Sequence, residues 1–243
     1  MDTRVLPPVD HQPRVHGQSW WSALRVMPRW DVMARRALRS QRLKRLMDIM
    51  VAGLALMVGA PLFLMVALAV WCSSPGRLFY VQRRLGQDRK PFGCIKFRTM
   101  VQGADRQLRR TLKNSAQLQD DFCRGFKLKN DPRITPVGHM LRRTSLDELP
   151  QFLNILRGDM SLVGPRPIVR AEAERYGEAI DQVLSVRPGL TGLWQVSGRN
   201  NLTYAQRVVL DLQYVSQRSL VLDLAILWRT VGVVLFPKDN GAY

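Results

Sequence analysis

The sequence has few cysteines and few histidines, three of each among 243 residues. They are Cys72, Cys94, Cys123, His11, His16 and His139. The cysteines form no close pair, and the histidines form no cluster with them at the spacing of metal ligands. This distribution argues against a disulfide framework and against a structural zinc site.

The first residues also lack a secretory signal. Residues 1–19 contain prolines and polar side chains but no apolar stretch of the signal-peptide type. We therefore expect this segment to be a disordered tail and the functional domain to lie in the cytoplasm.

Acidic residues are scarce: 19 Asp and Glu face 37 Lys and Arg, which leaves a net charge of +18. Such an excess predicts an anionic partner. A membrane surface, nucleotide phosphates and nucleic acid all satisfy that requirement, so charge alone does not choose among them.

Charge is absent altogether between Asp48 and Arg77. The apolar core of this run, residues 49–72, exceeds the roughly 20 residues that a helix needs to cross a bilayer. Seven Lys and Arg lie in residues 29–48 and seven more in residues 77–98. Since basic flanks stay on the cytoplasmic side, both ends of the segment favour the same side. This symmetry predicts a re-entrant hairpin.

Pro61 offers a place for the hairpin to turn, because proline lacks the N–H of the helical ladder and clashes with the preceding turn. Gly59 loosens the backbone further. Each arm of about 12 residues then reaches about 18 Å, just over half of the roughly 30 Å hydrocarbon core. The alternative is a crossing helix with a proline kink, which membranes tolerate.

Residues 139–167 contain the densest chemistry, with Asp147 and Glu148 side by side near the start of a predicted helix. In one interpretation, Ser145 and Glu148 form a capping box and the acids are structural. However, Pro150 lacks an N–H, so we expect a regular helix to begin slightly later and leave the two acids at its mouth.

An ionised carboxylate at such a position can attack phosphorus, and its neighbour can hold Mg²⁺ together with substrate phosphates. Phosphoryl transfer also needs fixed positive charge. The candidate suppliers are Lys96, Arg98, Arg142 and Arg166, although each alone is as easily a solvated surface charge. Arg166 stands out because Pro165 and Pro167 restrict its backbone. Gly189 and Gly192 permit either close backbone approach to a ligand or simple turns.

Several long motifs in order resemble the bacterial sugar transferase family from about Arg42 onward. They are KRLMDIMVAGLALMVGAPLFL, KFRTM, DPRITPVGHMLRRTSLDELPQFLNILRGDMSLVGPRP, VRPGLTGLWQVSGRN and LDLQYV. The family comprises monotopic polyprenyl-phosphate phosphoglycosyl transferases. The resemblance implies transfer of a sugar-1-phosphate from a UDP-sugar to undecaprenyl phosphate, with release of UMP, in the first membrane step of exopolysaccharide repeat-unit synthesis.

The resemblance also assigns roles. It implies a covalent phosphosugar-aspartate on Asp147 and a Mg²⁺ ion held by Glu148 and Asp147. Contacts to phosphates or the nucleotide would come from Lys96, Arg98, Arg142 and Arg166, and more weakly from Arg187, Arg199 and Asn200. The C-terminal motifs are similar to those of hexose-1-phosphate transferases, which favours galactose or glucose as the sugar. Anionic lipids and downstream glycosyltransferases are the expected further partners, and nucleic acid is not expected.

The family's membrane helix is re-entrant and broken at a proline that matches Pro61, which strengthens the hairpin prediction. Many members of the family that this chain resembles have Ser-Pro at this point, whereas this chain has Ala60-Pro61. A serine hydroxyl could satisfy backbone groups in the membrane, so the sequence leaves open what holds the bend here. The chain also lacks the additional N-terminal membrane helices of larger relatives, and we expect a minimal form.

We therefore expect an α+β fold, mainly helical, on the cytoplasmic face of the bacterial inner membrane. Its parts are a disordered tail (1–19), a basic interfacial helix and lead-in (20–48), a re-entrant anchor (49–76) and a catalytic domain with short strands (77–243). Within the last part we expect two strands in 77–100 with turns at Gly86 and 91–93. We also expect a helix followed by a mobile loop in 101–130, and helices in 146–157 and 172–186. A C-terminal amphipathic helix at 220–236 would be a core or interfacial element.

Two other functions compete with the transferase. A membrane-tethered, basic nucleic-acid-binding protein would account for the net charge, although no nucleic-acid module is recognisable and lipid phosphates explain the basic flanks. A non-catalytic scaffold of a polysaccharide assembly complex would give no reason for the pair Asp147-Glu148. An alternative for the lead-in is a solvated basic linker.

Overall fold

The longest element is one helix, α1 (Met33–Ser73), in a computed structural model that describes residues 33–113, 131–198 and 201–235. The predicted tail and the first part of the lead-in, residues 20–32, lie outside the described residues. Among the described residues, one helix is long and apolar enough to cross a membrane, and it covers Gln41–Ser73. The predicted membrane segment is therefore present as a helix.

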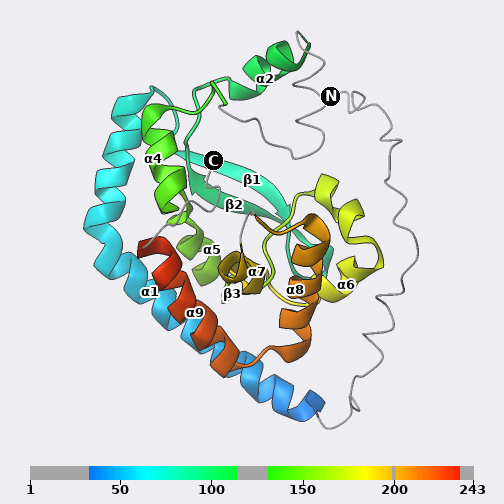
Figure 1. Ribbon diagram of the computed structural model, residues 1–243. Helices are drawn as coiled ribbons and strands as arrows, with labels where there is room; N and C mark the ends of the chain where they lie inside the picture. The colour runs from blue at the N-terminus through cyan, green and yellow to red at the C-terminus, as the bar shows by residue number, and fades with distance from the viewer. Residues whose placement is uncertain (1–32, 114–130, 199–200, 236–243) are drawn as a thin grey trace. The chain divides into compact units, whose positions relative to one another are not determined.

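The predicted interruption at Pro61 is not present, because α1 continues through this residue. A proline removes one ladder hydrogen bond and bends a helix without having to end it. Figure 1 shows α1 changing direction along its length, so the segment is one bent helix rather than two arms joined by a loop.

The two ends of the membrane segment pack on the rest of the unit that runs from Ser40 to Tyr243. Near the first end, Ala52 is fully buried. Near the second, Val66 and Val70 pack with Phe97 and Leu141 in a small core. Between and around these contacts, most large apolar side chains of α1 are exposed, with Met57 and Val58 each 70% exposed.

A β-hairpin follows α1. Strands β1 (Phe79–Leu85) and β2 (Pro91–Phe97) are antiparallel, with Phe79 opposite Phe97. The connection contains Gly86 and the 3-10 turn η2 (Gln87–Arg89), which confirms the predicted strands and first turn. The second predicted turn, at 91–93, is wrong: these residues open β2, and proline is tolerated there because it is the first residue of the strand.

Helices α2 (Ala104–Lys113) and α4 (Pro136–Thr144) come next, followed by the 3-10 turn η3 (Leu146–Glu148) and α5 (Gln151–Arg157). The loop predicted after α2 falls on residues outside the described part of the chain. Fully buried Asn154 ties α5 to β2, because its Nδ2 donates to the Gly93 carbonyl at 2.7 Å and its Oδ1 accepts from the Ile95 amide at 3.0 Å.

Strands β3 (Ser161–Val163) and β4 (Gly189–Thr191) form a short parallel pair. The helix predicted for 172–186 is largely wrong. The chain forms the 3-10 segment η4 (Arg170–Ala179) and the short helix α6 (Ile180–Val183). Gly177 breaks a regular helix there, since its φ is 52°.

Three more helices complete the described chain: α7 (Leu193–Ser197), α8 (Tyr204–Gln217) and α9 (Leu220–Leu235). Tyr214 of α8 and Ile226 of α9 join the main core with Leu162 and Val163. The fold is therefore mainly helical with short strands, as predicted. The outer face of α9 remains apolar and exposed, with Trp228 80% and Val221 78% exposed, as an interfacial helix would be.

Candidate active site

The two acids lie in a tight turn between α4 and α5. Asp147 and Glu148 belong to the 3-10 turn η3, and α5 begins only at Gln151, as the position of Pro150 predicts. The capping-box interpretation is wrong. Ser145 has a left-handed backbone (φ 59°), ends α4 and makes no side-chain cap hydrogen bond within the described structure.

The Glu148 carboxylate instead pairs with a lysine from the neighbouring strand. Lys96 Nζ lies 2.6 Å from Glu148 Oε1, and both side chains are mostly buried. The hairpin register puts Lys96 opposite Tyr80 near the open end of β2. Because η3 packs on this strand, the ion pair links the turn to the hairpin.

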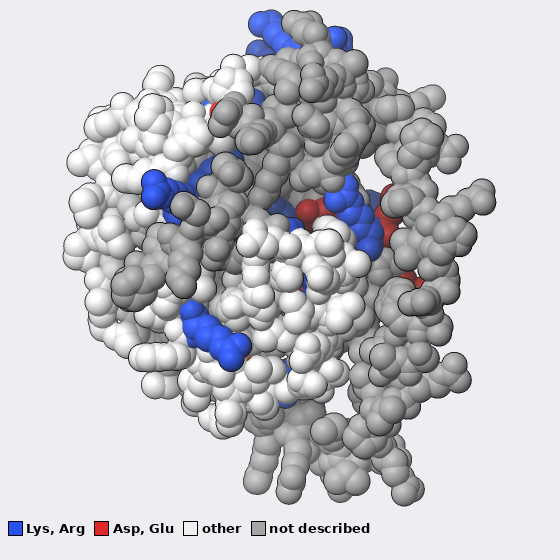
Figure 2. Space-filling view, in the orientation of Figure 1, with Lys and Arg blue, Asp and Glu red and all other residues white. Residues whose placement is uncertain are grey.

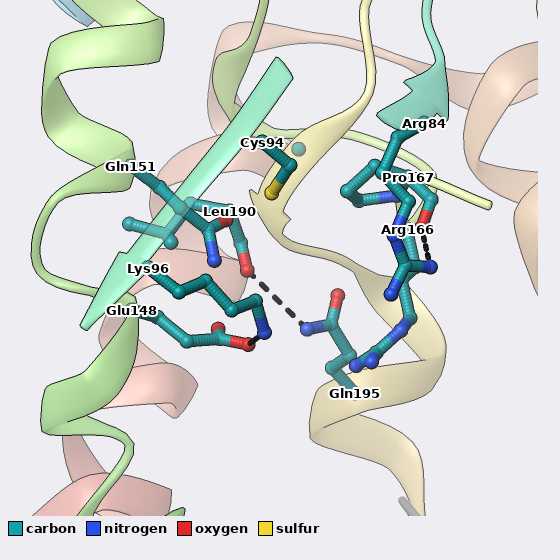
Figure 3. Close-up of a pocket in the computed structure, with 10 residues that line it drawn as sticks. Arg84, Cys94, Lys96, Glu148, Gln151, Arg166, Pro167, Leu190 and Gln195 are labelled. Atoms are coloured by element: carbon teal, nitrogen blue, oxygen red, sulfur yellow. Dashed lines mark hydrogen bonds and ion pairs between the residues drawn. The ribbon is translucent and has the colours of Figure 1, made fainter. Parts of the chain in front are cut away.

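This ion pair borders a small, open hollow in the surface. Lys96 and Glu148 line one side of the hollow, and Arg84, Arg166 and Gln195 line the opposite side (Figure 3). The hollow thus has cationic groups on both sides, and its one carboxylate lies beside the lysine. Such a setting favours an anion that also tolerates a nearby carboxylate, as a metal-bound phosphate does.

Figure 2 shows where charged side chains lie on one face of the molecule. On the face it shows, red and blue atoms meet around a recess to the right of the centre, while most of the described surface is uncharged. Further Lys and Arg groups lie apart from this recess, at the top, on the left and in the lower part of the view.

Asp147 and Glu148 have opposite pKa shifts although they are neighbours. Burial raises the pKa of Asp147 to about 6, against the opposing influence of Lys96. Burial also acts on Glu148, but Lys96 and Arg166 outweigh it and hold its pKa below the usual range. Two carboxyls whose surroundings separate their pKa values are typical of sites where each has its own chemical task.

Asp147 is 8% exposed and is not among the residues that line the hollow in the described structure. It precedes Glu148 directly, so its carboxyl belongs to the same turn as one that lines the hollow.

Arg166 lies where the sequence predicts, in the loop after β3. Its guanidinium carbon lies 5.9 Å from the centre of the Trp194 ring, a cation–π distance that steadies a guanidinium without using its N–H donors. Of the predicted basic residues, Lys96 and Arg166 therefore line one hollow, while the others have different surroundings.

Arg98 and Arg142 are bound elsewhere. Arg98 donates to the carbonyls of Ser74 and Pro75 at the end of α1, so its role in phosphate binding is not supported. Arg142 Nε donates to Thr99 Oγ1 at 2.9 Å and favours the ionised form of Asp147.

The remaining predicted contacts come from the glycine-rich segment. Arg187 does not line the hollow within the described structure. Arg199 and Asn200 lie outside the described residues. The glycines allow backbone packing: a Cβ on Gly189 would lie 2.1 Å from the Gly164 amide nitrogen.

Sequence reasoning missed Arg84, Gln151 and Gln195 as lining residues. Arg84 donates from Nη1 to the Pro167 carbonyl at 2.9 Å and thereby holds the loop that carries Arg166. The sequence signal for Arg84 was only its place among alternating basic and apolar residues of β1. Gln195 gave no signal.

The acidic pair was also predicted to hold Mg²⁺. Among the described residues, no group of three or more His, Cys, Asp or Glu forms a metal cluster. Two adjacent carboxylates still fit Mg²⁺, because this ion takes one or two carboxylates together with substrate phosphates and water.

A hollow lined by one carboxylate, a lysine and arginines, with a second, buried carboxyl in the same turn and a long apolar helix in the same chain, is suited to phosphoryl transfer at a membrane surface. The chain belongs to the bacterial sugar transferase family, whose model matches residues 39–237.

Three relatives illustrate the similarity. The exopolysaccharide production protein ExoY of Sinorhizobium fredii is 48% identical over 197 residues, which cover 81% of this chain and 87% of ExoY. The UDP-glucose:undecaprenyl-phosphate glucose-1-phosphate transferase of Caulobacter vibrioides is 41% identical over 205 residues, 81% of this chain and 71% of the relative. The undecaprenyl-phosphate galactose phosphotransferase of Salmonella typhimurium is 48% identical over 208 residues, 85% of this chain but 43% of the relative. The chain thus spans less than half of this last relative.

The raised pKa of Asp147 predicts a pH-dependent effect on stability. The folded protein holds the carboxyl proton up to about pH 6, whereas an unperturbed aspartic acid releases it near 3.8. Above pH 6 the buried carboxylate therefore costs free energy, and Asp147→Asn should raise the free energy of unfolding at pH 7.5 by on the order of 2 kcal/mol. The gain should vanish as the pH falls towards 4.

Denaturant unfolding in detergent at pH 4 and pH 7.5 checks this prediction. Asp88→Asn, at an exposed position in η2, is the matched control and should change little at either pH. An equal gain from Asp147→Asn at both pH values would contradict the assignment.

Proposed function

We propose that this protein transfers hexose-1-phosphate from a UDP-hexose to undecaprenyl phosphate and releases UMP. The observation that carries the proposal is the hollow where Glu148, paired with Lys96, faces Arg166 beside the buried Asp147. Family membership supports the reaction type, and the names of the Salmonella and Caulobacter relatives support galactose or glucose as the hexose.

The reaction proceeds in two displacements at the same phosphorus. A carboxylate oxygen of Asp147 attacks the β-phosphorus of the UDP-hexose, and the bond to the bridging oxygen breaks, so that UMP leaves. The hexose phosphate is then esterified to Asp147. A phosphate oxygen of undecaprenyl phosphate attacks this phosphorus, the bond to the aspartate breaks, and the carboxylate is restored.

The surrounding residues reduce the charge that opposes each displacement. Lys96 and Arg166 approach the phosphates from two sides and neutralise negative charge in the transition state. Glu148, whose pKa is lowered, stays ionised and would hold Mg²⁺ with Asp147. The metal, when bound, would balance the negative charge of the substrate phosphates.

The acceptor is a lipid, and the described surface suits a membrane. Exposed apolar side chains cover α1 and α9, and the side of the molecule that these two helices form is mainly uncharged in Figure 2. We propose that both ends of α1 lie on the cytoplasmic side of the bacterial inner membrane, so that UDP-hexose and the lipid phosphate reach Asp147 from the same side. Anionic lipids would bind the basic flanks, and a glycosyltransferase would use the product in exopolysaccharide synthesis.

Replacement of the nucleophile tests the reaction. Asp147→Asn should lower kcat for lipid-linked product by more than about 10³-fold, because an amide cannot form the phosphorylated intermediate. The assay uses purified protein, Mg²⁺, undecaprenyl phosphate and UDP-galactose or UDP-glucose. Asp88→Asn should retain activity. Full activity in Asp147→Asn would reject Asp147 as the nucleophile, and absence of product from wild-type protein with any UDP-hexose would reject the proposed reaction.

The metal requirement has a separate test. Chelation with EDTA should abolish product formation, and added Mg²⁺ should restore it, because the two carboxylates need a cation to approach the substrate phosphates. Product yield with and without the chelator is the measurement. Undiminished activity in EDTA would show that Lys96 and Arg166 suffice.

The topology is tested with cysteines at two exposed glutamines on either side of the apolar run, Gln41 and Gln102. In a chain whose Cys72 and Cys123 are replaced by serine, a membrane-impermeant maleimide should label both positions in inverted vesicles and neither in intact spheroplasts. Labelling from opposite faces would show that α1 crosses the membrane.

A further inference from the structure

The charged turn that precedes the apolar run of α1 is bound to the segments that carry the candidate active site. Arg45 donates to the carbonyls of Ile155 (2.6 Å) and Leu156 (2.9 Å), near the end of α5. Asp48 Oδ1 accepts from the Leu162 amide in β3 at 3.0 Å. The start of the membrane segment therefore holds both the helix after the acidic turn and the strand before Arg166.

Lys44 makes the most extensive of these connections. Its Nζ lies 2.7 Å from Asp223 Oδ2 on α9 and donates to the Val163 carbonyl at 3.1 Å. The Tyr214 hydroxyl of α8 lies 2.9 Å from the same carbonyl and 2.8 Å from Asp223 Oδ1, and donates its one proton to either acceptor. Ser161 Oγ also reaches this carbonyl, at 3.1 Å. Side chains of α1, α8 and β3 thus meet at one carbonyl, and Asp223 of α9 holds two of them.

The network is shielded from water. Asp223 is 1% exposed and Tyr214 is 2% exposed. Burial and the nearby Asp223 raise the pKa of Tyr214, so its hydroxyl keeps the proton that it donates. In such surroundings hydrogen bonds are strong, and removing one partner leaves a costly unsatisfied group.

The carbonyl at the centre belongs to the last residue of β3. Val163 is followed by Gly164-Pro165-Arg166-Pro167, in which the prolines restrict the backbone on both sides of the arginine. The Gly164 amide is fixed in turn by the Thr191 carbonyl at 2.9 Å. A rotation of the Val163 peptide would therefore move Arg166 in the hollow.

We propose that Lys44, Asp223 and Tyr214 are positioning residues that set Arg166 through the Val163 carbonyl, so that the membrane helix is part of the active-site scaffold. The inference rests on the proposed function in assigning Arg166 to substrate phosphates. The competing role for Lys44 is that of one positive charge among several in the basic flank of the membrane segment.

Arg42 is the control residue that distinguishes these two roles of Lys44. It carries the same charge on the same flank, is exposed, and lies two residues before Lys44. Arg42→Met and Lys44→Met therefore change the flank equally, but only Lys44→Met removes contacts to Val163 and Asp223. For the hydroxyl, Tyr214→Phe keeps the buried ring, and Tyr80→Phe at an exposed position is the matched control.

The kinetic test follows UMP release with increasing UDP-hexose. Tyr214→Phe and Lys44→Met should lower kcat/KM for the UDP-hexose by about 10- to 100-fold, the cost of misplacing a phosphate-binding group by about 1 Å. The KM for undecaprenyl phosphate should stay unchanged, and Lys44→Arg should restore most of the loss. Arg42→Met and Tyr80→Phe should match the wild type.

Hydrogen–deuterium exchange tests the positioning without relying on activity. Peptides covering residues 161–168 should exchange faster in Tyr214→Phe and Lys44→Met, with no change in peptides covering β1 and β2. Lys44→Met leaves the buried Asp223 carboxylate without its cation and can prevent folding. In that case the exchange and kinetics of Tyr214→Phe test the proposal.

Unchanged exchange and kinetics in Tyr214→Phe, or an equal loss in Arg42→Met and Lys44→Met, would overturn the proposal. Wild-type protein without transferase activity would reject the proposed function instead, while the exchange measurement would still report on the positioning.

Discussion

The attachment of α1 to the remainder of its unit is the constraint on which the site depends. The outer surface of this helix is apolar and cannot specify by itself where the helix docks, because apolar contacts have little direction. Lys44, Arg45 and Asp48 provide that direction by binding backbone groups of α5 and β3 and the carboxylate of Asp223. Buried ionic contacts of this kind give uncertain net stability, but they are demanding in geometry. They fix one arrangement of the anchor.

The same arrangement explains the electrostatics of the acidic turn. Once α5 and β3 are fixed, η3 must lie against β2, where Lys96 meets Glu148. One carboxyl thereby obtains a cation and stays ionised, while Asp147 is buried with less compensation and its pKa rises. The difference between two adjacent acids thus comes from the packing of the turn, which local sequence does not contain.

This dependence on packing decides how much the sequence could predict. The apolar run, the hairpin of β1 and β2 and the late start of α5 follow from periodicity and proline positions, and the motifs place Lys96, Glu148 and Arg166 at one site. The surroundings of the other arginines do not. Arg98 binds the residues after α1 and Arg84 holds the loop after β3, yet both are arginines in or next to a strand of the same hairpin. Their partners are distant in sequence, so charge and spacing could not tell them apart.

The bend in α1 also depends on packing. The sequence has no serine beside Pro61 to satisfy the freed backbone, and both Ala60 and Pro61 are exposed. Both ends of the membrane segment are nevertheless held: Ala52 packs against α5 and β3, and Val66 packs against β2 and α4. Because these contacts belong to one unit, they determine the directions of the two halves, and the proline only lowers the cost of bending between them. A side-chain hydroxyl at the bend is therefore not needed to set its angle, and the docking of Lys44, which fixes the first half, also contributes to the shape of the anchor.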